Sequence, residues 1–298
     1  GRFDIGMFNA IFQYITDNRP DVKVVCTDEF EKRLKPSLNV DTIPELKLKL
    51  RDYQQDIVNN CISRGRGTVV LATAGGKTLT IATLLEAIFR SNKKFKCALI
   101  VPDLGLVNQT FDDFDEYGVT FGFSKWTGSH DINLASNVII CNLGILQSDK
   151  SNTEWLNHVD VCVVDEVHKL RKGNKINKLL KTVRTDNRFG LTGTMPEDKV
   201  DQWNIIGKIG PVIYERNSAQ LRKDNYISDV KVQVLQLEYE GRPNYPTQIS
   251  TPVERYRVET EFIAYNKFRN NVLSSLCSRF DNNALILVDY IDHGKTLH

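Results

Sequence analysis

The stretch Leu71-Ala72-Thr73-Ala74-Gly75-Gly76-Lys77-Thr78 decides the fold of this chain of 298 residues. An apolar run, Thr68 to Leu71, precedes it, and residues 79–89 follow with the composition of a helix. A buried strand, a turn of small residues and a helix that begins at Gly-Lys-Thr surround a phosphate with backbone N–H groups. The stretch therefore predicts a loop that binds a nucleoside triphosphate through Ala74, Gly75, Gly76, Lys77 and Thr78.

One position departs from the full pattern of such loops. The pattern has Gly where this chain has Leu71. The alternative interpretation is a plain strand-to-helix turn that carries a lysine by chance. The segments described below decide between the two.

The composition limits the class of protein. With 41% hydrophobic and 26% charged residues, it is typical of an ordinary soluble globular protein. No run approaches the ~18 apolar residues that span a bilayer, and the N-terminus lacks a secretory signal pattern. We therefore expect a cytoplasmic protein with no membrane partner. A net charge of +2 permits a local nucleic-acid surface but does not itself indicate one.

The six cysteines form no C-x-x-C pair. Their wide spacing argues against a zinc site, and three of them, Cys97, Cys141 and Cys162, stand in apolar strand-like runs. A thiol in such a run behaves as a small hydrophobic side chain. We expect reduced core cysteines.

Strand-like and helix-like runs alternate after the phosphate loop. Residues 97–101 are apolar and stop at Pro102, residues 103–117 have the pattern of a helix, and residues 137–142 form another strand-like run. This order predicts an α/β fold with a doubly wound, mostly parallel sheet. The carboxyl ends of its strands would share one edge, where ligands bind in such sheets.

Two carboxylates follow the apolar run Val161 to Val164, in the segment Asp165-Glu166-Val167-His168. Alternation along a strand points Asp165 and Glu166 in opposite directions, one toward a metal and one toward a water. With the phosphate loop, this pair supplies what hydrolysis of Mg²⁺-ATP requires: Lys77 on the β- and γ-phosphates, Thr78 and Asp165 on Mg²⁺, and a base for the attacking water. The predicted cofactors are ATP and Mg²⁺.

Two further segments flank these motifs. Leu50-Arg51-Asp52-Tyr53-Gln54 lies upstream of the phosphate loop, and its Gln54 is a candidate for reading an adenine edge, since an amide both donates and accepts. Downstream, residues 188–194 form a short strand that ends in the hydroxyls of Thr192 and Thr194.

Taken in order, these segments resemble the superfamily 2 helicases of the Asp-Glu-x-His type. The matching segments are Leu50 to Gln54, Ala74 to Thr78, Val101-Pro102 with Leu106 and Gln109, Asp165 to His168, and Leu191 to Thr194. The resemblance covers about residues 48–214 and implies a RecA-like motor domain. Within that superfamily the chain is similar to the UvsW-type bacteriophage helicases, which remodel branched DNA during recombination.

The resemblance also implies roles for individual residues. Arg51 and Gln54 would contact ATP, Asp165 would hold Mg²⁺ with Thr78, and Glu166 would act as the base. His168, Thr192 and Thr194 would couple hydrolysis to movement of DNA. Pro102, Gln109 and Asn142 lie in segments that contact the DNA backbone, although Asp103 and Asn142 stand where many relatives have Thr.

The expected domain organisation has four parts. Residues 1–40 would be a partial N-terminal α/β accessory domain, with a helix over 8–15 and a strand over 21–26. Residues 41–229 would be the first RecA-like motor domain, and residues 230–281 a linker and approach helix, with a helical pattern over 256–280. Residues 282–298 would start a second RecA-like domain with a strand over 283–290. Because that domain supplies arginines to the γ-phosphate in this family, we expect this fragment alone to hydrolyse ATP weakly.

The sequence thus predicts an ATP-dependent DNA helicase or translocase that remodels forks and Holliday junctions in recombination and repair, with recombination or replication proteins as possible partners. One alternative is the motor part of a nuclease or restriction system, because Asp21 and Glu45-Leu46-Lys47 resemble the Asp and Glu-x-Lys pattern of metal-dependent nucleases. Another is a nucleotide-gated DNA-binding scaffold without helicase activity. A GTPase is disfavoured, since the Asn-Lys-x-Asp motif is missing from the sequence.

Overall fold

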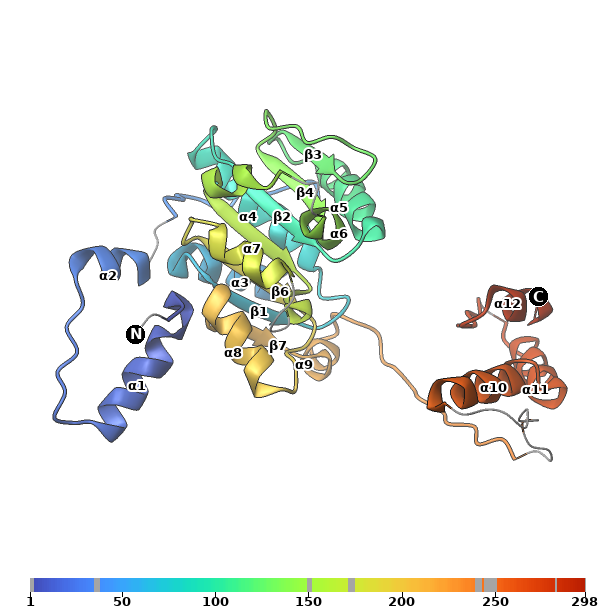
Figure 1. Cartoon of the computed structure of the whole chain (residues 1–298). Helices are drawn as coiled ribbons and strands as arrows, with labels where there is room; N and C mark the ends of the chain where they lie inside the picture. The colour runs from blue at the N-terminus through green and yellow to red at the C-terminus, as the bar shows by residue number, and fades with distance from the viewer. Residues whose placement is uncertain are drawn as a thin grey trace. The chain divides into compact units, whose positions relative to one another are not determined.

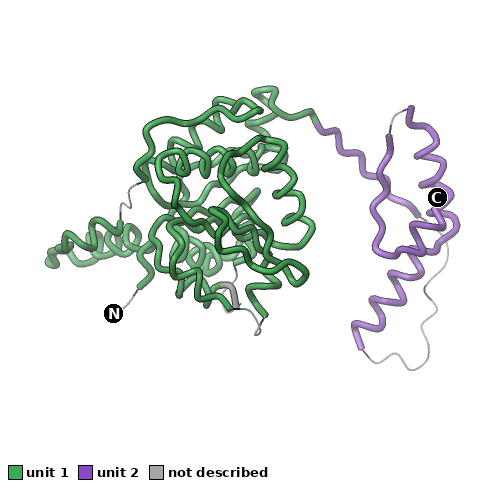
Figure 2. The backbone as a smooth tube through the Cα atoms, turned by 90° about the horizontal axis from the view of Figure 1, so that it is seen from above, with its two compact units in different colours: residues 1–229 green, residues 230–298 purple. Residues whose placement is uncertain are grey.

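The computed structural model describes residues 3–34, 38–148, 152–170, 175–238, 243, 251–281 and 283–297, with the backbone alone at 175 and 176. It divides the chain into two compact units, Gly1–Asp229 and Val230–His298 (Figure 2). The N-terminal residues 1–40 fall in the same unit as the phosphate loop. Each unit is described by itself.

The first unit is built on one seven-stranded sheet with the order β3-β4-β2-β5-β6-β1-β7. All pairs of neighbouring strands are parallel, which confirms the predicted doubly wound sheet. The strands are β1 (Gly67–Leu71), β2 (Cys97–Val101), β3 (Phe123–Trp126), β4 (Val138–Asn142), β5 (Val161–Asp165), β6 (Arg188–Thr192) and β7 (Val212–Arg216).

Helices cover both faces of this sheet (Figure 1). One face packs against α3 (Asp52–Arg64), α4 (Lys77–Ser91) and α5 (Leu104–Tyr117). The other packs against α6 (Leu143–Gln147), α7 (Lys175–Thr182) and α8 (Lys199–Lys208), together with the short helices η2 (Glu154–His158) and η3 (Val167–Lys169). The helix α9 (Ser218–Lys223) follows β7. In the part of the chain that the structure describes, every helix is too short or too polar to cross a bilayer.

The two cores explain why the central strands are apolar at every position. In β2, Leu99 and Val101 belong to the core on the α4 face, whereas Ala98 and Ile100 belong to the core on the α8 face. Because successive side chains of a strand point to opposite faces, a sheet covered on both sides buries them all. The continuous apolar run that predicted this strand follows from that burial.

The N-terminal segment is helical. It contains η1 (Ile5–Met7), α1 (Phe8–Asn18) and α2 (Asp28–Leu34), and α1 confirms the helix predicted over residues 8–15. The strand predicted over 21–26 is wrong: these residues pair with no other strand in the described chain, and Val25 is 77% exposed. Apolar residues alone do not make a strand, because an unpaired strand leaves its backbone N–H and C=O groups without partners.

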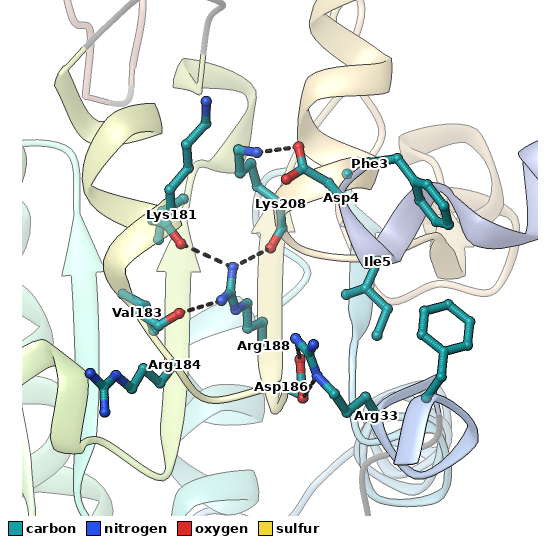
Figure 3. Close-up of a pocket in the computed structure, with 13 residues that line it drawn as sticks. Phe3, Asp4, Ile5, Arg33, Lys181, Val183, Arg184, Asp186, Arg188 and Lys208 are labelled. Atoms are coloured by element: carbon teal, nitrogen blue, oxygen red, sulfur yellow. Dashed lines mark hydrogen bonds and ion pairs between the residues drawn. The ribbon is translucent and has the colours of Figure 1, made fainter. Parts of the chain in front are cut away.

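A cavity of about 980 Å³ lies between this segment and the amino-terminal end of β6 (Figure 3). Two ion pairs lie in its lining: Asp4 with Lys208, and Arg33 Nε with Asp186 Oδ2 at 2.9 Å. Arg188 donates to main-chain carbonyls. These contacts anchor the N-terminal segment. Since the strands are parallel, the cavity is at the opposite edge of the sheet from the phosphate loop.

The second unit contains α10 (Pro252–Ala264), α11 (Lys267–Cys277) and α12 (Ile291–Leu297). The helical pattern predicted over 256–280 therefore corresponds to two helices, α10 and α11, that are separated at Asn266. The Asn266 Oδ1 atom caps α11 by accepting a hydrogen bond from Arg269 N at 2.9 Å. The strand predicted over 283–290 does not form. Leu285 and Leu287 are 85% and 87% exposed, because no strand in the described part of this unit offers a partner.

Candidate active site

The phosphate loop joins β1 to the first turn of α4, which begins at Lys77. Gly76 has a φ of 76°, in the left-handed region that favours glycine. A Cβ atom at this position would also lie 2.3 Å from Gln54 Nε2. Both constraints require glycine here. The loop thus leads directly into α4, with Lys77 and Thr78 in the first turn of the helix.

Two side chains of the upstream segment hold this loop. Tyr53 Oη donates to the Gly75 carbonyl at 2.9 Å, and Gln54 Nε2 donates to the same oxygen at 3.0 Å. Gln54 Oε1 in turn accepts from Arg51 N at 2.9 Å, which closes a capping box at the start of α3. Gln54 is only 3% exposed. Its amide therefore positions the phosphate loop, and the reading of an adenine edge by Gln54 stays a prediction.

Leu71 takes the place of the pattern's glycine because Gly75 leaves room for it. The Leu71 side chain is fully buried, and a Cβ atom on Gly75 would lie 2.6 Å from Leu71 Cγ. The leucine thus fills the space beneath the loop. The leucine in place of glycine therefore changes the packing beneath the loop. The loop backbone still surrounds the candidate phosphate site.

Replacing Leu71 with Ala should destabilise the protein by about 2–5 kcal/mol, because it leaves a cavity in a fully buried core. Urea unfolding of the first unit measures this loss. Leu104→Ala is the matched control, since Leu104 is 48% exposed, and it should change the free energy of unfolding by about 0.5 kcal/mol or less. Equal effects of the two substitutions would contradict the packing role of Leu71.

The acidic pair emerges where β5 leaves the sheet. Glu166 has a φ of 49°, so the chain turns sharply after Asp165, and the Glu166 N–H donates to Asp165 Oδ1 at 2.9 Å. Glu166 Oε1 is 2.5 Å from Lys77 Nζ of the phosphate loop. Burial raises the pKa of Asp165, and the positive charge of Lys77 partly opposes this. The two carboxylates and the loop lysine therefore share one partly buried site.

A chain of polar contacts continues from Glu166 to the end of β6. Glu166 Oε2 lies 3.2 Å from His168 Nδ1, and the same nitrogen lies 2.8 Å from Thr192 Oγ1. Thr192 Oγ1 donates its only hydrogen to the Thr194 carbonyl at 2.8 Å. It must then accept from His168, which places a proton on Nδ1. We call these five residues, Lys77, Glu166, His168, Thr192 and Thr194, the polar chain.

The oxygen donors near the loop suit Mg²⁺. Mg²⁺ is usually held by one or two protein oxygens together with phosphate oxygens and waters. The Asp165 carboxylate at the end of β5 and the Thr78 hydroxyl in the first turn of α4 provide such oxygens. Within the described ranges, no cluster of three or more His, Cys, Asp or Glu side chains could hold a metal by itself.

The residues predicted to contact DNA lie near the carboxyl ends of β2 and β4. Pro102 is buried, Gln109 is exposed on α5, and the Asn142 Oδ1 atom accepts from Ile145 N at 3.3 Å as the cap of α6. Asp103 caps α5 in the same way, accepting from Leu106 N at 3.0 Å. Asp and Asn are strong N-caps, so both side chains are used to start a helix. Only Gln109 of the three predicted residues has an exposed side chain.

The nuclease-like residues do not form a metal site in the described chain. Asp21 is paired with Arg19 at 2.7 Å, and this contact lowers the pKa of the Asp21 carboxyl. Near Glu45, the Lys47 N–H donates to the Tyr117 carbonyl at 3.1 Å. The geometry therefore gives the nuclease alternative no support.

Three residues beside the phosphate loop were not recognised as a group from the sequence. The Tyr53 and Tyr226 rings lie 4.9 Å apart in an edge-on arrangement, and Arg216 Cζ lies 4.9 Å from the Tyr53 ring. Tyr53 belongs to a motif segment and was available as a signal. Arg216 is the last residue of β7 and Tyr226 follows α9, and neither belongs to a local motif.

Comparisons with known proteins agree with this geometry. The chain is 27% identical to the DNA 3′-5′ translocase XPB2 of Sulfurisphaera tokodaii, over 69% of this chain and 45% of that protein. It is 25% identical to the XPB helicase/translocase subunit of the general transcription and DNA repair factor IIH of Drosophila melanogaster, over 66% of this chain and 25% of that protein. The chain thus spans less than half the length of these relatives.

Solved structures show the same fold. A structure of bacteriophage T4 UvsW matches 99% of this chain and 60% of its own with a TM-score of 0.58 and 17% identity. A second UvsW structure matches 71% of this chain and 78% of its own with a TM-score of 0.54 and 19% identity.

The family model described as "Type III restriction enzyme, res subunit" matches residues 47–197. That range holds the phosphate loop, the acidic pair and Thr192 to Thr194, so the chain belongs to this family, within the superfamily 2 helicases.

Proposed function

We propose that this chain is the motor part of an ATP-dependent DNA helicase or translocase. The observation that carries the proposal is the polar chain, in which Lys77 and Glu166 of the hydrolysis site connect through His168 to Thr192 and Thr194. A change in the contacts of Glu166 during hydrolysis alters the hydrogen bonds at the end of β6. A motor needs such a connection between the hydrolysis site and a second part of the domain, whereas an enzyme that only hydrolyses ATP does not. The helicase and translocase names of the relatives support the same conclusion.

The residues of the site act in a definite order. When a nucleotide binds, Lys77 leaves Glu166 and donates to phosphate oxygens, since a charge-assisted bond to phosphate replaces the one at 2.5 Å. The freed Glu166 carboxylate accepts a proton from the attacking water. His168 keeps its Nδ1 proton directed at Thr192 and Glu166, which holds both in place. Asp165 and Thr78 would hold Mg²⁺, which would supply positive charge to the phosphates when bound.

We propose further that the substrate is branched DNA, such as a fork or a four-way junction, and that recombination or replication proteins are partners. The likeness of the fold to UvsW and the order of the motifs support this assignment. The test compares ATP hydrolysis by the complete protein with single-stranded, duplex, fork and four-way DNA side by side. We expect branched DNA to stimulate hydrolysis most. Equal stimulation by plain duplex would contradict the branched substrate, and ATP binding without DNA-stimulated turnover would favour the scaffold alternative.

DNA binding should weaken steeply with salt, because phosphate contacts release counterions. A protein that contacts several phosphates loses roughly 10³-fold in affinity between about 50 and 200 mM salt. Fluorescence anisotropy with labelled DNA measures the slope. Gln109→Ala should weaken binding without changing the slope, since a neutral amide displaces no counterion. A flat salt response of the unchanged protein would count against a motor that follows the DNA backbone.

A further inference from the structure

We propose that the cavity of about 980 Å³ between the N-terminal segment and the amino-terminal end of β6 binds a nucleotide, with the phosphate on its cations and the base on its aromatic rings (Figure 3). The cavity lies at the edge of the sheet opposite the phosphate loop, so it is a different site from that of ATP hydrolysis. The inference stands on the lining of the cavity and is independent of the proposed motor.

Positive charge exceeds negative charge around this cavity. The lining holds two carboxylates, Asp4 and Asp186, and five cations: Arg33, Lys181, Arg184, Arg188 and Lys208. A further cation, Arg66, lies behind this lining, with its Nη1 atom 3.7 Å from Asp186 Oδ1. The excess is larger than the net charge of +2 of the whole chain. A concave surface of one charge sign attracts a ligand of the opposite sign, so the expected ligand is an anion.

Two of the guanidinium groups have no carboxylate of their own. The hydrogen bonds of Arg188 go to main-chain carbonyls at 2.6–3.1 Å. Arg66 is 5% exposed, and its Nη1 and Nη2 atoms have no hydrogen-bond partner in the part of the chain that the structure describes. Burial lowers the pKa of Arg66 to about 10, and the charge of Arg188 lowers it further. Buried charge is costly unless it is compensated, and an anion in the cavity would compensate both groups.

Arg33 can donate to a ligand without leaving Asp186 unpaired. Its Nε and Nη2 atoms donate to the two Asp186 oxygens at 2.9 and 3.2 Å, and its side chain is 53% exposed. If Arg33 turned to a phosphate, Asp186 would keep Arg66, which is already close to Oδ1. A guanidinium group binds phosphate with two parallel hydrogen bonds, as it binds a carboxylate. The arrangement therefore allows Arg33 to exchange one anion for another.

Lys181 and Arg184 are available to the same ligand. Lys181 belongs to α7 and Arg184 lies between α7 and β6, and both side chains are exposed. Both line the cavity, and neither has an ion-pair partner among the described residues. They would contact a phosphate without breaking an existing contact.

Aromatic rings line another part of the cavity. The Phe3 and Phe30 rings lie 6.5 Å apart in an edge-on arrangement, and Phe3 is 48% exposed. In Figure 3, Phe3 lies on one side and Lys181 and Arg184 on the other. Bases stack on exposed aromatic rings. The volume is at the upper end of the range for small-molecule sites and far exceeds that of a phosphate alone. A ligand with a phosphate and a planar base fits this lining, either as a free nucleotide or as part of a DNA strand.

The test measures the affinity of the chain for thymidine 5′-monophosphate by isothermal titration, and for labelled oligo-dT of about ten nucleotides by fluorescence anisotropy. The double variant Lys181→Ala, Arg184→Ala should weaken binding about 10- to 100-fold, because two charged donors to phosphate are lost. A loss for the monophosphate alone identifies a free nucleotide, and a loss for the oligonucleotide identifies a strand. Lys94→Ala, at an exposed lysine outside the lining, is the control and should change neither affinity. Lys77→Ala should change monophosphate affinity less than about twofold, since the phosphate loop lies at the other edge of the sheet.

Substitution of Phe3 tests the stacking of the base. Phe3→Ala should weaken monophosphate binding about 5- to 100-fold and the binding of inorganic phosphate less than about twofold. Phe3→Tyr keeps the ring and should restore binding, whereas Phe3→Leu keeps apolar packing on Phe30 and should behave like the Ala variant. No binding of either probe, or a loss in Lys77→Ala as large as in the double variant, would overturn the site. Equal loss of phosphate and monophosphate in the Phe3 variants would overturn the base surface. Failure of the proposed motor would look different: the cavity would bind its nucleotide, but DNA would not stimulate hydrolysis by the complete protein.

Discussion

Replacing Glu166 with Gln should lower the turnover of ATP by the complete protein by about 10²- to 10⁴-fold, which is the usual contribution of a general base. The amide cannot accept the proton of the attacking water. ATP affinity, in contrast, should rise several-fold. In the structure Glu166 Oε1 lies 2.5 Å from Lys77 Nζ, and a neutral side chain competes less for this lysine and repels the triphosphate less.

Steady-state hydrolysis and equilibrium binding of ATP measure the two effects separately. Glu116→Gln is the matched control, because Glu116 is exposed on α5, and neither quantity should change. Unchanged turnover in the Glu166 variant would remove this residue from the role of base. Lost turnover together with weakened ATP binding would instead indicate that Glu166 supports the phosphate loop.

The sequence predicts the central sheet and the hydrolysis site well because their signals are local. A strand buried on both faces is apolar at every position, as in residues 97–101, and the loop at 72–78 needs small residues at fixed spacing. The acidic pair directly follows such a strand. Parallel strands then bring Lys77 and Glu166 to one edge, although 88 residues lie between them, because every strand ends there.

The remaining features depend on contacts between distant segments. Val22 and Val25 have the composition of a strand, yet only a neighbouring strand would have made them one. The Gln54 side chain also donates to the Gly75 carbonyl, a contact that no spacing in the sequence indicates. Likewise, the capping role of Asn142 depends on how the chain leaves β4, and the meeting of Tyr226 with Arg51 depends on the turn after α9.

Replacing Lys77 with Ala should nearly abolish activity, by two effects that add. The loss of a charged donor to phosphate weakens ATP binding about 10- to 100-fold. The loss of a group that stabilises developing negative charge lowers turnover by a further factor of about 10²–10³. ATP binding and hydrolysis by the complete protein measure both, with Lys94→Ala at an exposed lysine as the control.

The combination of the Lys77 and Glu166 substitutions tests the geometry itself. The Nζ atom of Lys77 contacts Glu166 Oε1, so the tighter ATP binding expected for Glu166→Gln arises largely from freeing this lysine. In the Lys77→Ala background the glutamine should therefore give a smaller gain in ATP affinity, and the two effects should not be additive. Full additivity would mean that the contact does not compete with ATP.

The same Lys77 variant addresses the nuclease alternative: metal-dependent DNA cleavage that survived Lys77→Ala and vanished in Asp21→Ala would restore it, although Asp21 pairs with Arg19 in the structure.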